Sequence, residues 1–467
     1  MIKLDAALGM PIHINPSLFE KSTSLAISQG HNRVLLIVTA TKPCFYKLWG
    51  VMNECIKQEL PFIILHSGQH YDEIVGHGLK EFSFDEFLGI DYNLRGDLVD
   101  KSAELFVKTK VFANYCKTEY PDILFVPYVN GDTMTAGIFP AAWLFSTNHM
   151  CIHGEAGLRS MAPKQFNKLT GFESPSDLIE WQWNPNWEVI RNEPFPEQYD
   201  TFIAGAGCAC HFPPVNLNAD HLIREGYDPS TVHVVGNTVV DVISAKESKN
   251  VGISVFDEYP KLKNGNWLRM DIHRRENLNP KRFETIVSFV EQLVEQGHYI
   301  AFIELTGTKL AINKYGLRER FDSLNEKDNF ILTPIWKEYC HVIEFLRSEN
   351  CKAILTDSGS MQEEMNQLQK PCFTIRFSTD RPETVMAKGN LLVPPLRTEQ
   401  MVGIVEHVLN NEDIFSNMKT APRLYGSNVS NSIVKIIKTL FKNKDQFFYW
   451  ATERLGIYKD DDFPEYL

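Results

Sequence analysis

The sequence contains no block rich in lysine or arginine and no long apolar run. The formal charge of the 467 residues is −12, so neither nucleic acid nor an anionic membrane surface is expected as the main partner. No stretch approaches the roughly 18 apolar residues of a membrane-spanning helix. The first residues also lack a basic segment followed by an apolar one. We therefore expect a cytoplasmic protein, in which a local positive cluster holds any anionic ligand.

Cysteine is sparse and irregularly placed, with nine residues scattered along the chain. An odd, scattered set favours free thiols in a reducing compartment over a disulfide framework. Cys208, Cys210 and His211 stand close together, but no second ligand pair with zinc-like spacing accompanies them. Gly-x-Ser-x-Gly and His-Glu-x-x-His patterns are missing too, which leaves hydrolase and zinc-protease readings without support. We predict packed small side chains at this triplet, and neither a metal nor another cofactor.

Short apolar runs alternate with segments of helical periodicity, such as residues 97–120 and 280–296, which predicts an α/β fold. Continuous apolar runs are typical of parallel strands that are covered on both faces. The expected strands are RVLLIVT from Arg33, PFIIL from Pro61, PDILFVP from Pro121, MCIH from Met150, WLRMDI from Trp267, YIAFIEL from Tyr299, NFILT from Asn329, KAILT from Lys352 and PCFTI from Pro371. The series restarts after residues 233–243. We therefore predict two doubly wound, Rossmann-like domains facing across a cleft.

One turn suits a phosphate. ILTDSGSMQEE, residues 354–364, joins an apolar strand, a small-residue turn and a helix-like start. Such a turn places free backbone N–H groups and the positive end of a helix dipole at one point. No Gly-Lys-Ser/Thr follows, so it is not a Walker loop, and it is not the dinucleotide pattern Gly-x-Gly-x-x-Gly. The alternative is an ordinary helix capped by Asp357 or Ser358.

Positive side chains follow the first expected strand of each half. IHRREN, residues 272–277, concentrates one histidine and two arginines at a strand's carboxyl end, where they can stabilise a leaving diphosphate. A surface salt-bridge cluster is the alternative. Lys42 and Lys47 hold the equivalent place in the first half.

Two acids end expected strands of the first half. Asp132 in NGDTMTA and Glu155 in HGEAGLRS each stand beside a glycine directly after an apolar run. Two acids at one sheet edge can act as proton donor and acceptor when their environments separate their pKa values. Asp132 precedes Thr133, so a helix-capping role is the alternative for it.

Together these segments resemble the non-hydrolysing branch of the UDP-N-acetylglucosamine 2-epimerase family, over about residues 33–440. Single motifs are weak, whereas eight in the order of the family are a specific signal. The motifs are SGQHYD (67–72), NGDTMTA (130–136), GEAGLRS (154–160), PFPEQYD (194–200), VVGNTVVD (234–241), HRREN (273–277), TDSGSMQEE (356–364) and RPETV (381–385).

The resemblance implies a glycosyltransferase-B architecture, with domains at residues 1–235 and 236–425 and a helix and tail at 426–467 that return to the first domain. It also implies a reaction, the interconversion of UDP-GlcNAc and UDP-ManNAc for the synthesis of cell-surface glycan precursors. UDP is eliminated across C1–C2 to give a 2-acetamidoglycal, and is then re-added with a proton delivered to the opposite face. A homodimer is implied as well.

Site residues follow from the same matching, motif by motif. The implied catalytic residues are Asp132, Glu155, Glu197 and His273. The implied UDP-binding residues are Lys42, Lys47, Arg274, Lys337, Val342, Ser358, Gly359, Ser360, Glu364 and Arg381. Gln69 and His70 match a segment that contributes to an allosteric UDP-GlcNAc site in bacterial members, although Tyr71 replaces an arginine frequent there.

The sequence departs from the family pattern in one long segment. Residues 162–193 separate two implied catalytic acids and carry Trp181, Trp183 and Trp187. This insertion, like the aromatic and acidic tail after about Lys442, fits either an interface or lid element or an ordered surface excursion. Three alternatives therefore stay open: a 2-epimerase acting on a modified (6-deoxy or uronic) UDP-HexNAc, a hydrolysing 2-epimerase, and a glycosyltransferase or nucleotide-sugar-binding protein of the same fold.

Overall fold

A computed structural model describes residues 2–6, 8–69, 78–164, 174–184, 186–191, 193–247, 253–336 and 338–442. By internal contacts the chain divides into two units. The first comprises residues 1–158, 195–242 and 426–467, and the second comprises residues 159–194 and 243–425.

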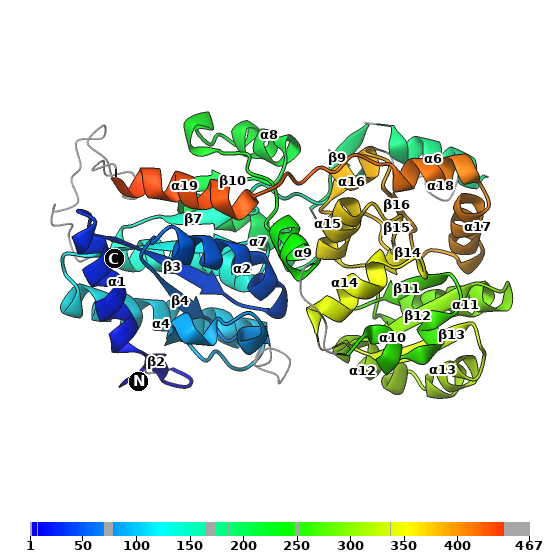
Figure 1. Ribbon diagram of the computed structural model, residues 1–467, viewed down its shortest axis with the longest axis horizontal. Helices are drawn as coiled ribbons and strands as arrows, with labels where there is room; N and C mark the ends of the chain where they lie inside the picture. Colours follow the sequence, from blue (N-terminus) through cyan, green and yellow to red (C-terminus); the bar gives the residue numbers. More distant parts are fainter. Residues whose placement is uncertain are drawn as a thin grey trace. The chain divides into compact units, whose positions relative to one another are not determined.

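The apolar runs of the first half form an eight-stranded sheet in the first unit (Figure 1). Its order is β1-β2-β5-β4-β3-β6-β7-β10, parallel from β5 to β10 and antiparallel where β2 meets β1 and β5. The strands are β1 (Ile2–Leu4), β2 (Ile12–Ile14), β3 (Arg33–Thr39), β4 (Phe62–His66), β5 (Leu88–Asp91), β6 (Leu124–Asn130), β7 (Cys151–Gly154) and β10 (Cys208–Phe212).

Helices cover this sheet, and its central strands, such as β3 and β6, are therefore buried along their whole length. The helices are α1 (Pro16–Ser28), α2 (Lys42–Lys57), α4 (Leu98–Glu119), α5 (Met134–Thr147), α7 (Glu197–Ala204), α8 (Asn216–Arg224) and α19 (Val429–Lys442). The chain passes from the first unit to the second within α9 (Val239–Glu247), after Val242. Single 3-10 turns lie at Asp85–Phe87, Gly205–Gly207 and Pro229–Thr231. The predicted helix over residues 97–120 is α4, which begins at a reciprocal cap between Asp97 and Asp100.

The last described helix, α19, packs against α2 although nearly 400 residues separate them (Figure 1). Asp241 accepts the backbone N–H of Ser430 at 2.7 Å, and Arg33 donates to the backbone oxygen of Leu440 at 2.6 Å. The end of the described chain is therefore part of the first unit. The tail from residue 443 onward lies outside the described residues.

The second unit contains a parallel six-stranded sheet in the order β13-β12-β11-β14-β15-β16. Its strands are β11 (Trp267–Asp271), β12 (Tyr299–Glu304), β13 (Phe330–Pro334), β14 (Cys351–Thr356), β15 (Cys372–Thr374) and β16 (Asn390–Leu392). Every strand predicted from the sequence is present, and the α/β fold class is confirmed.

Ten helices of the second unit flank this sheet within the described residues. They are α6 (Pro175–Trp183), α10 (Val255–Glu258), α11 (Pro280–Glu295), α12 (Thr306–Lys314), α13 (Arg318–Asn325), α14 (Tyr339–Arg347), α15 (Gly359–Leu368), α16 (Pro382–Met386), α17 (Thr398–Leu409) and α18 (Glu412–Lys419), with a 3-10 turn at Pro260–Lys263. The predicted helix over residues 280–296 is α11. Asn279 caps it by accepting the N–H of Arg282 at 3.1 Å, and its apolar stripe lies in the core.

The described part of the insertion belongs to the second unit, whereas the sequence placed it within the first domain. A two-stranded antiparallel sheet contains β8 (Met161–Pro163) and β9 (Trp187–Val189), and Met161 exchanges backbone hydrogen bonds with Thr379. Gln182 on α6 accepts the N–H of Leu392 at 2.6 Å and donates to its carbonyl at 2.9 Å. Trp187 donates to the backbone oxygen of Gln182 at 3.0 Å. Of the two interpretations of this segment, ordered local packing fits these contacts.

Candidate functional site

Glu155 is held in place by several polar side chains of the first unit. It follows β7 directly, and Asn130 at the end of β6 is the register partner of Gly154. The Glu155 carboxylate accepts from Asn130 Nδ2 at 2.9 Å and from Asn237 Nδ2 at 2.6 Å, and forms a short ion pair with Lys47. Three converging donors, one of them a buried cation, stabilise the charged form and fix its orientation.

The backbone of Glu155 is unusual as well, because its φ is 55°. A non-glycine residue in this region costs about 1–3 kcal/mol and recurs at functional sites. The side chain is 6% exposed. Lys47, predicted to bind UDP, lies on α2 and is buried against this carboxylate. Its first observable role is therefore to neutralise Glu155.

Asp132 does not cap the helix that follows it. Thr133 takes that position, and its side chain accepts the N–H of Ala136 at 3.2 Å. The capping alternative for Asp132 is therefore wrong. Gly131, the residue before Asp132, lies close to Glu155, since a Cβ built on Gly131 would lie 2.9 Å from Glu155 Oε2.

Glu197, the third predicted acid, is the first residue of α7, a helix that packs against α5. One turn later α7 carries Asp200, which is 2% exposed. Burial raises the pKa of Asp200 to about 8, and the charges of Asp132 and Glu197 add to this rise. Asp132, Glu197 and Asp200 thus form one acidic cluster, named here by these three residues.

In the second unit Asp357 organises the loop after β11. Its carboxylate accepts the backbone N–H of His273 at 3.1 Å, the N–H of Arg274 at 3.0 Å and Asn277 Nδ2 at 3.1 Å. His273 Nδ1 also lies 3.0 Å from Asp357 Oδ1. Asp357 is fully buried, whereas the His273 side chain is 39% exposed. The imidazole is therefore anchored through Nδ1, and its other nitrogen is left for a ligand.

Two opposing influences act on His273. Burial lowers its pKa, but the charge and hydrogen bond of Asp357 more than offset this, so the pKa of His273 is raised above its ordinary value. Burial alone would raise the pKa of Asp357. The charge and hydrogen bond of His273, together with the N–H of Arg274, instead bring the pKa of Asp357 below its ordinary value. The pair favours an imidazolium, which is the charge state that suits a neighbouring diphosphate.

The turn after β14 is not an ordinary capped helix. Ser358 occupies the N-cap position of α15 without a side-chain capping bond, and Asp357 points to the 273–277 loop instead. Ser358 Oγ and Ser360 Oγ lie 3.3 Å apart, so the two hydroxyls stand together at the start of the helix. A Cβ on Gly359 would lie 3.0 Å from Asp380 Oδ2. Of the two interpretations of this turn, the anion cradle fits better.

Arg381 is less available than the sequence indicated. It is 2% exposed and engages Asp380 at 3.1 Å and, at a shorter distance, Glu363. Arg376 and Arg274 also approach Asp380, at 2.8 Å and 3.7 Å. Burial opposes ionisation of Asp380, but the three arginines bring its pKa far below the usual range. This network lies next to the turn, since Asp380 is the residue that a Cβ on Gly359 would meet.

The remaining predicted residues occupy varied places. Glu364 is buried on α15 and accepts from the hydroxyl of Tyr339 at 2.9 Å. Val342 lies on α14 and packs against the core. Lys42 is the first residue of α2. Gln69 accepts the N–H of Thr135 at 3.1 Å, which ties it to the first turn of α5. Lys337 and His70 lie outside the described residues.

The Cys208, Cys210 and His211 triplet is confirmed as part of the packed interior. All three lie on β10 and are buried, and the His211 ring packs edge-on to Tyr227 at 4.6 Å. Burial lowers the pKa of His211 to about 3. All nine cysteines are free thiols.

Sequence reasoning missed the residues that position the predicted ones. Asn130 and Asn237 donate hydrogen bonds to Glu155, and Asp357 accepts one from His273. Asp380 pairs with Arg376 and Arg381, and Asp200 lies beside two other acids. Four of them, Asn130, Asn237, Asp200 and Asp357, stand inside the motifs NGDTMTA, VVGNTVVD, PFPEQYD and TDSGSMQEE. The available signal was a polar residue beside a predicted catalytic one.

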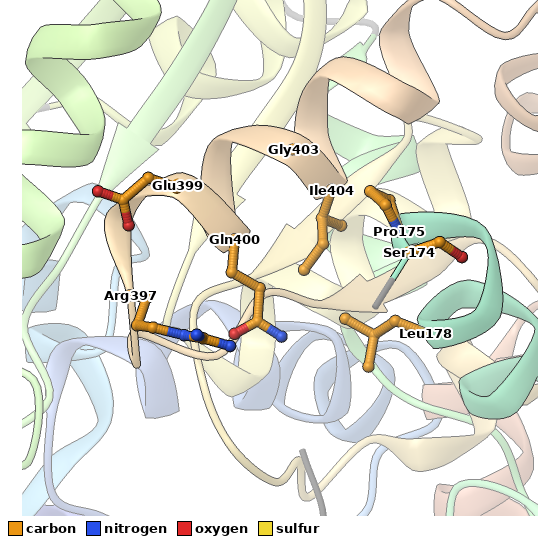
Figure 2. Close-up of a pocket in the computed structure, with 8 residues that line it drawn as sticks. All are labelled: Ser174, Pro175, Leu178, Arg397, Glu399, Gln400, Gly403 and Ile404. Carbon is orange, nitrogen blue, oxygen red and sulfur yellow. The ribbon is translucent and has the colours of Figure 1, made fainter. Parts of the chain in front are cut away.

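A separate cavity of ≈ 270 Å³ lies between α6 and α17 in the second unit (Figure 2). Leu178, Gln400 and Ile404 point toward one another there, while Glu399 points away (Figure 2). None of the predicted site residues lines it.

Comparison with known proteins assigns the family. The family model described as UDP-N-acetylglucosamine 2-epimerase matches residues 190–440, which is more than half of the chain. The chain belongs to this family. Among curated relatives, UDP-N-acetylglucosamine 2-epimerase of Methanocaldococcus jannaschii is 28% identical over 84% of this chain and 97% of its own length. The enzyme of that name from Campylobacter jejuni is 26% identical over 88% and 98%.

Solved structures of the family share the fold. The M. jannaschii enzyme in complex with UDP-GlcNAc and UDP has a TM-score of 0.68 at 24% identity, covering 87% of this chain and 99% of its own. The Neisseria meningitidis enzyme bound to UDP-GlcNAc has a TM-score of 0.68 at 22% identity, covering 88% and 100%. The chain therefore has the α/β fold of these epimerases, with two Rossmann-like units of the glycosyltransferase-B type. Within the described residues no helix is both long and apolar enough to cross a bilayer.

Proposed function

We propose that the chain is a non-hydrolysing UDP-2-acetamido-sugar 2-epimerase that interconverts UDP-GlcNAc and UDP-ManNAc. The observation that carries the proposal is the contrast among the acids of the first unit. Glu155 is held by three donors, whereas Asp132 and Glu197 share a region with the buried acid Asp200. Acids in different environments are what a reaction with one proton removed and one returned requires. The names of the relatives support the same substrate.

The reaction begins at a C2 hydrogen that no neighbouring carbonyl activates. One carboxylate takes this proton, the C1–C2 double bond forms, and the C1–O bond breaks with its electron pair leaving on the diphosphate. The glycal and UDP then recombine in the reverse sense, with a proton delivered to the opposite face of C2. Asp132, Glu155 and Glu197 are the candidates for both proton transfers.

The second unit retains UDP through this cycle. His273, poised as a cation by Asp357, and the uncapped start of α15 hold the diphosphate. Glu364, buried on the same helix, holds the ribose as the resemblance implies. No NAD and no metal is required in this scheme. A homodimer, a cytoplasmic location and a role in cell-surface polysaccharide synthesis go with the proposal as predictions.

The test is product analysis with a panel of UDP-2-acetamido sugars, including 6-deoxy and uronic forms. We expect reversible interconversion of UDP-GlcNAc and UDP-ManNAc, reaching the same ratio from either side, with no net release of UDP. Stoichiometric release of UDP with a free amino sugar would instead establish a hydrolysing enzyme. Turnover confined to a modified sugar would reassign the substrate.

A further inference from the structure

Asp200 lies against the first turn of α5, the helix that begins two residues after Asp132. Glu197 and Asp200 are three residues apart on α7 and therefore share a helix face. A Cβ built on Gly137 of α5 would lie 2.9 Å from Asp200 Oδ1 and 3.0 Å from Asp200 Cα. The two helices approach this closely only because residue 137 has no side chain. This contact fixes the depth at which the Asp200 carboxyl is buried.

Among the described residues, the charges that act on the Asp200 carboxyl are those of two acids and include no cation. Asp200 Oδ2 is buried without a hydrogen-bond partner in the described chain. The charged groups that act on Asp200 are Asp132, from the loop before α5, and Glu197, on its own helix. Helix α5 and the 3-10 turn after α7, which both pack here, carry no titratable side chain. An acid that is 2% exposed and has one carboxyl oxygen without a partner thus lies beside two other acids, a stronger signal than acidic residues alone.

Like charges at short range disfavour one another, so the negative charges of Asp132 and Glu197 favour the protonated form of Asp200. Burial decides which of them keeps the proton. Asp132 and Glu197 are half-buried, while Asp200 is nearly inaccessible to water. The rise in the pKa of Asp200 to about 8 agrees with this order.

We propose that Asp200 is a positioning residue that stores one proton for Asp132 and Glu197 during epimerisation. The inference rests on the proposed function. Each turnover leaves the acid that gave a proton ionised and the acid that took one protonated. Asp200 passes its proton to the first and regains one from the second. The number of protons in the acidic cluster is then the same before and after each cycle.

The decisive variant is Asp200→Asn, which keeps the size of the side chain and removes the proton that it stores. For the wild type we expect kcat to fall as pH rises through about 8, the point at which the store empties. In Asp200→Asn the store is missing at every pH, so this limb should disappear and kcat on its acid side should be about tenfold lower, with KM nearly unchanged. Asp200→Glu restores a titratable carboxyl and should bring the limb back. The matched control is Asp220→Asn, which alters an exposed acid of α8 in the same unit.

A second measurement on the free protein needs no substrate. Infrared difference spectra across a pH titration should show a protonated carboxyl that ionises near pH 8 and is missing in Asp200→Asn. A kcat profile of Asp200→Asn that superposes on the wild type, or a free protein without this titrating carboxyl, would overturn the inference while leaving the epimerase proposal intact. A free protein that shows this titrating carboxyl but does not epimerise the sugar would instead refute the proposed function, and the proton-store proposal with it.

Discussion

At the residue scale, the predicted catalytic side chains depend on neighbours that hold their charge state. Asp357 is the clearest case, because one carboxylate anchors two backbone N–H groups, one amide and the His273 ring. A histidine at a strand end could be recognised from the sequence alone. Its protonation could not, because the partner lies 84 residues away.

Asp357→Asn should lower the pKa of His273 below its ordinary value. The reason is that burial, which lowers this pKa, would then act without the opposing carboxylate. The raised wild-type pKa keeps the ring cationic at higher pH, so the ring should become neutral at lower pH in the variant. The measurement is NMR titration of the His273 ring protons. An unchanged His273 pKa would show that Asp357 does not set it.

Glu155→Gln should destabilise the first unit by about 3–5 kcal/mol. It leaves the buried ammonium of Lys47 without this carboxylate and turns an amide group toward the donors Asn130 and Asn237. The measurement is the free energy of unfolding in urea. Adding Lys47→Met should recover part of the loss. Strict additivity of the two changes would argue against a coupled pair.

At the element scale, close approaches between helices position the acids. Helix α7 lies against the first turn of α5 at Gly137, and the insertion helix α6 lies against α17. Apolar periodicity predicts that such helices exist, but not which neighbour each of them touches. For this reason the sequence did not show that the insertion packs on the second sheet.

Gly137→Ala should destabilise the protein by about 1–3 kcal/mol, because the added methyl meets the backbone and carboxyl of Asp200 at 2.9–3.0 Å. The control is Gly403→Ala in α17, whose new methyl meets only Pro175 at 3.6 Å. That change should stabilise by up to about 1 kcal/mol through helix propensity. Thermal unfolding of both variants tests the pair. Equal shifts in Tm would contradict the close packing of α7 on α5.

Gln182→Ala should cost about 1–3 kcal/mol, because it removes both hydrogen bonds that the insertion makes to the backbone of Leu392 on the edge strand β16. Affinity for UDP should fall as well, since Asn390 on β16 bonds Gln362 Oε1, and Gln362 bonds the carbonyl of Ser358. Urea unfolding and UDP titration are the measurements. Glu180→Ala on the exposed side of α6 is the matched control, and an equal effect of both changes would refute the bracing role.

At the scale of the whole molecule, the sequence predicted the α/β class, the central strands of both sheets and the family. Continuous apolar runs made the parallel strands visible, and ordered motifs made the family visible. The network of Asp380 with its arginines and the acidic cluster around Asp200 could not be predicted, because they arise from side chains that only the fold brings together. The structure also places the hydroxyl of Ser360 beside that of Ser358, at the start of α15, which has no side-chain cap.

The central claim is that this chain epimerises C2 by removing and returning a proton while it retains UDP. The most direct measurement is incubation of the protein with UDP-GlcNAc in D₂O, followed by NMR of the C2 signals. The account predicts deuterium at C2 of the UDP-ManNAc formed and, as the reaction reverses, at C2 of the remaining UDP-GlcNAc. Interconversion of the two isomers with C2 hydrogen fully retained would contradict it.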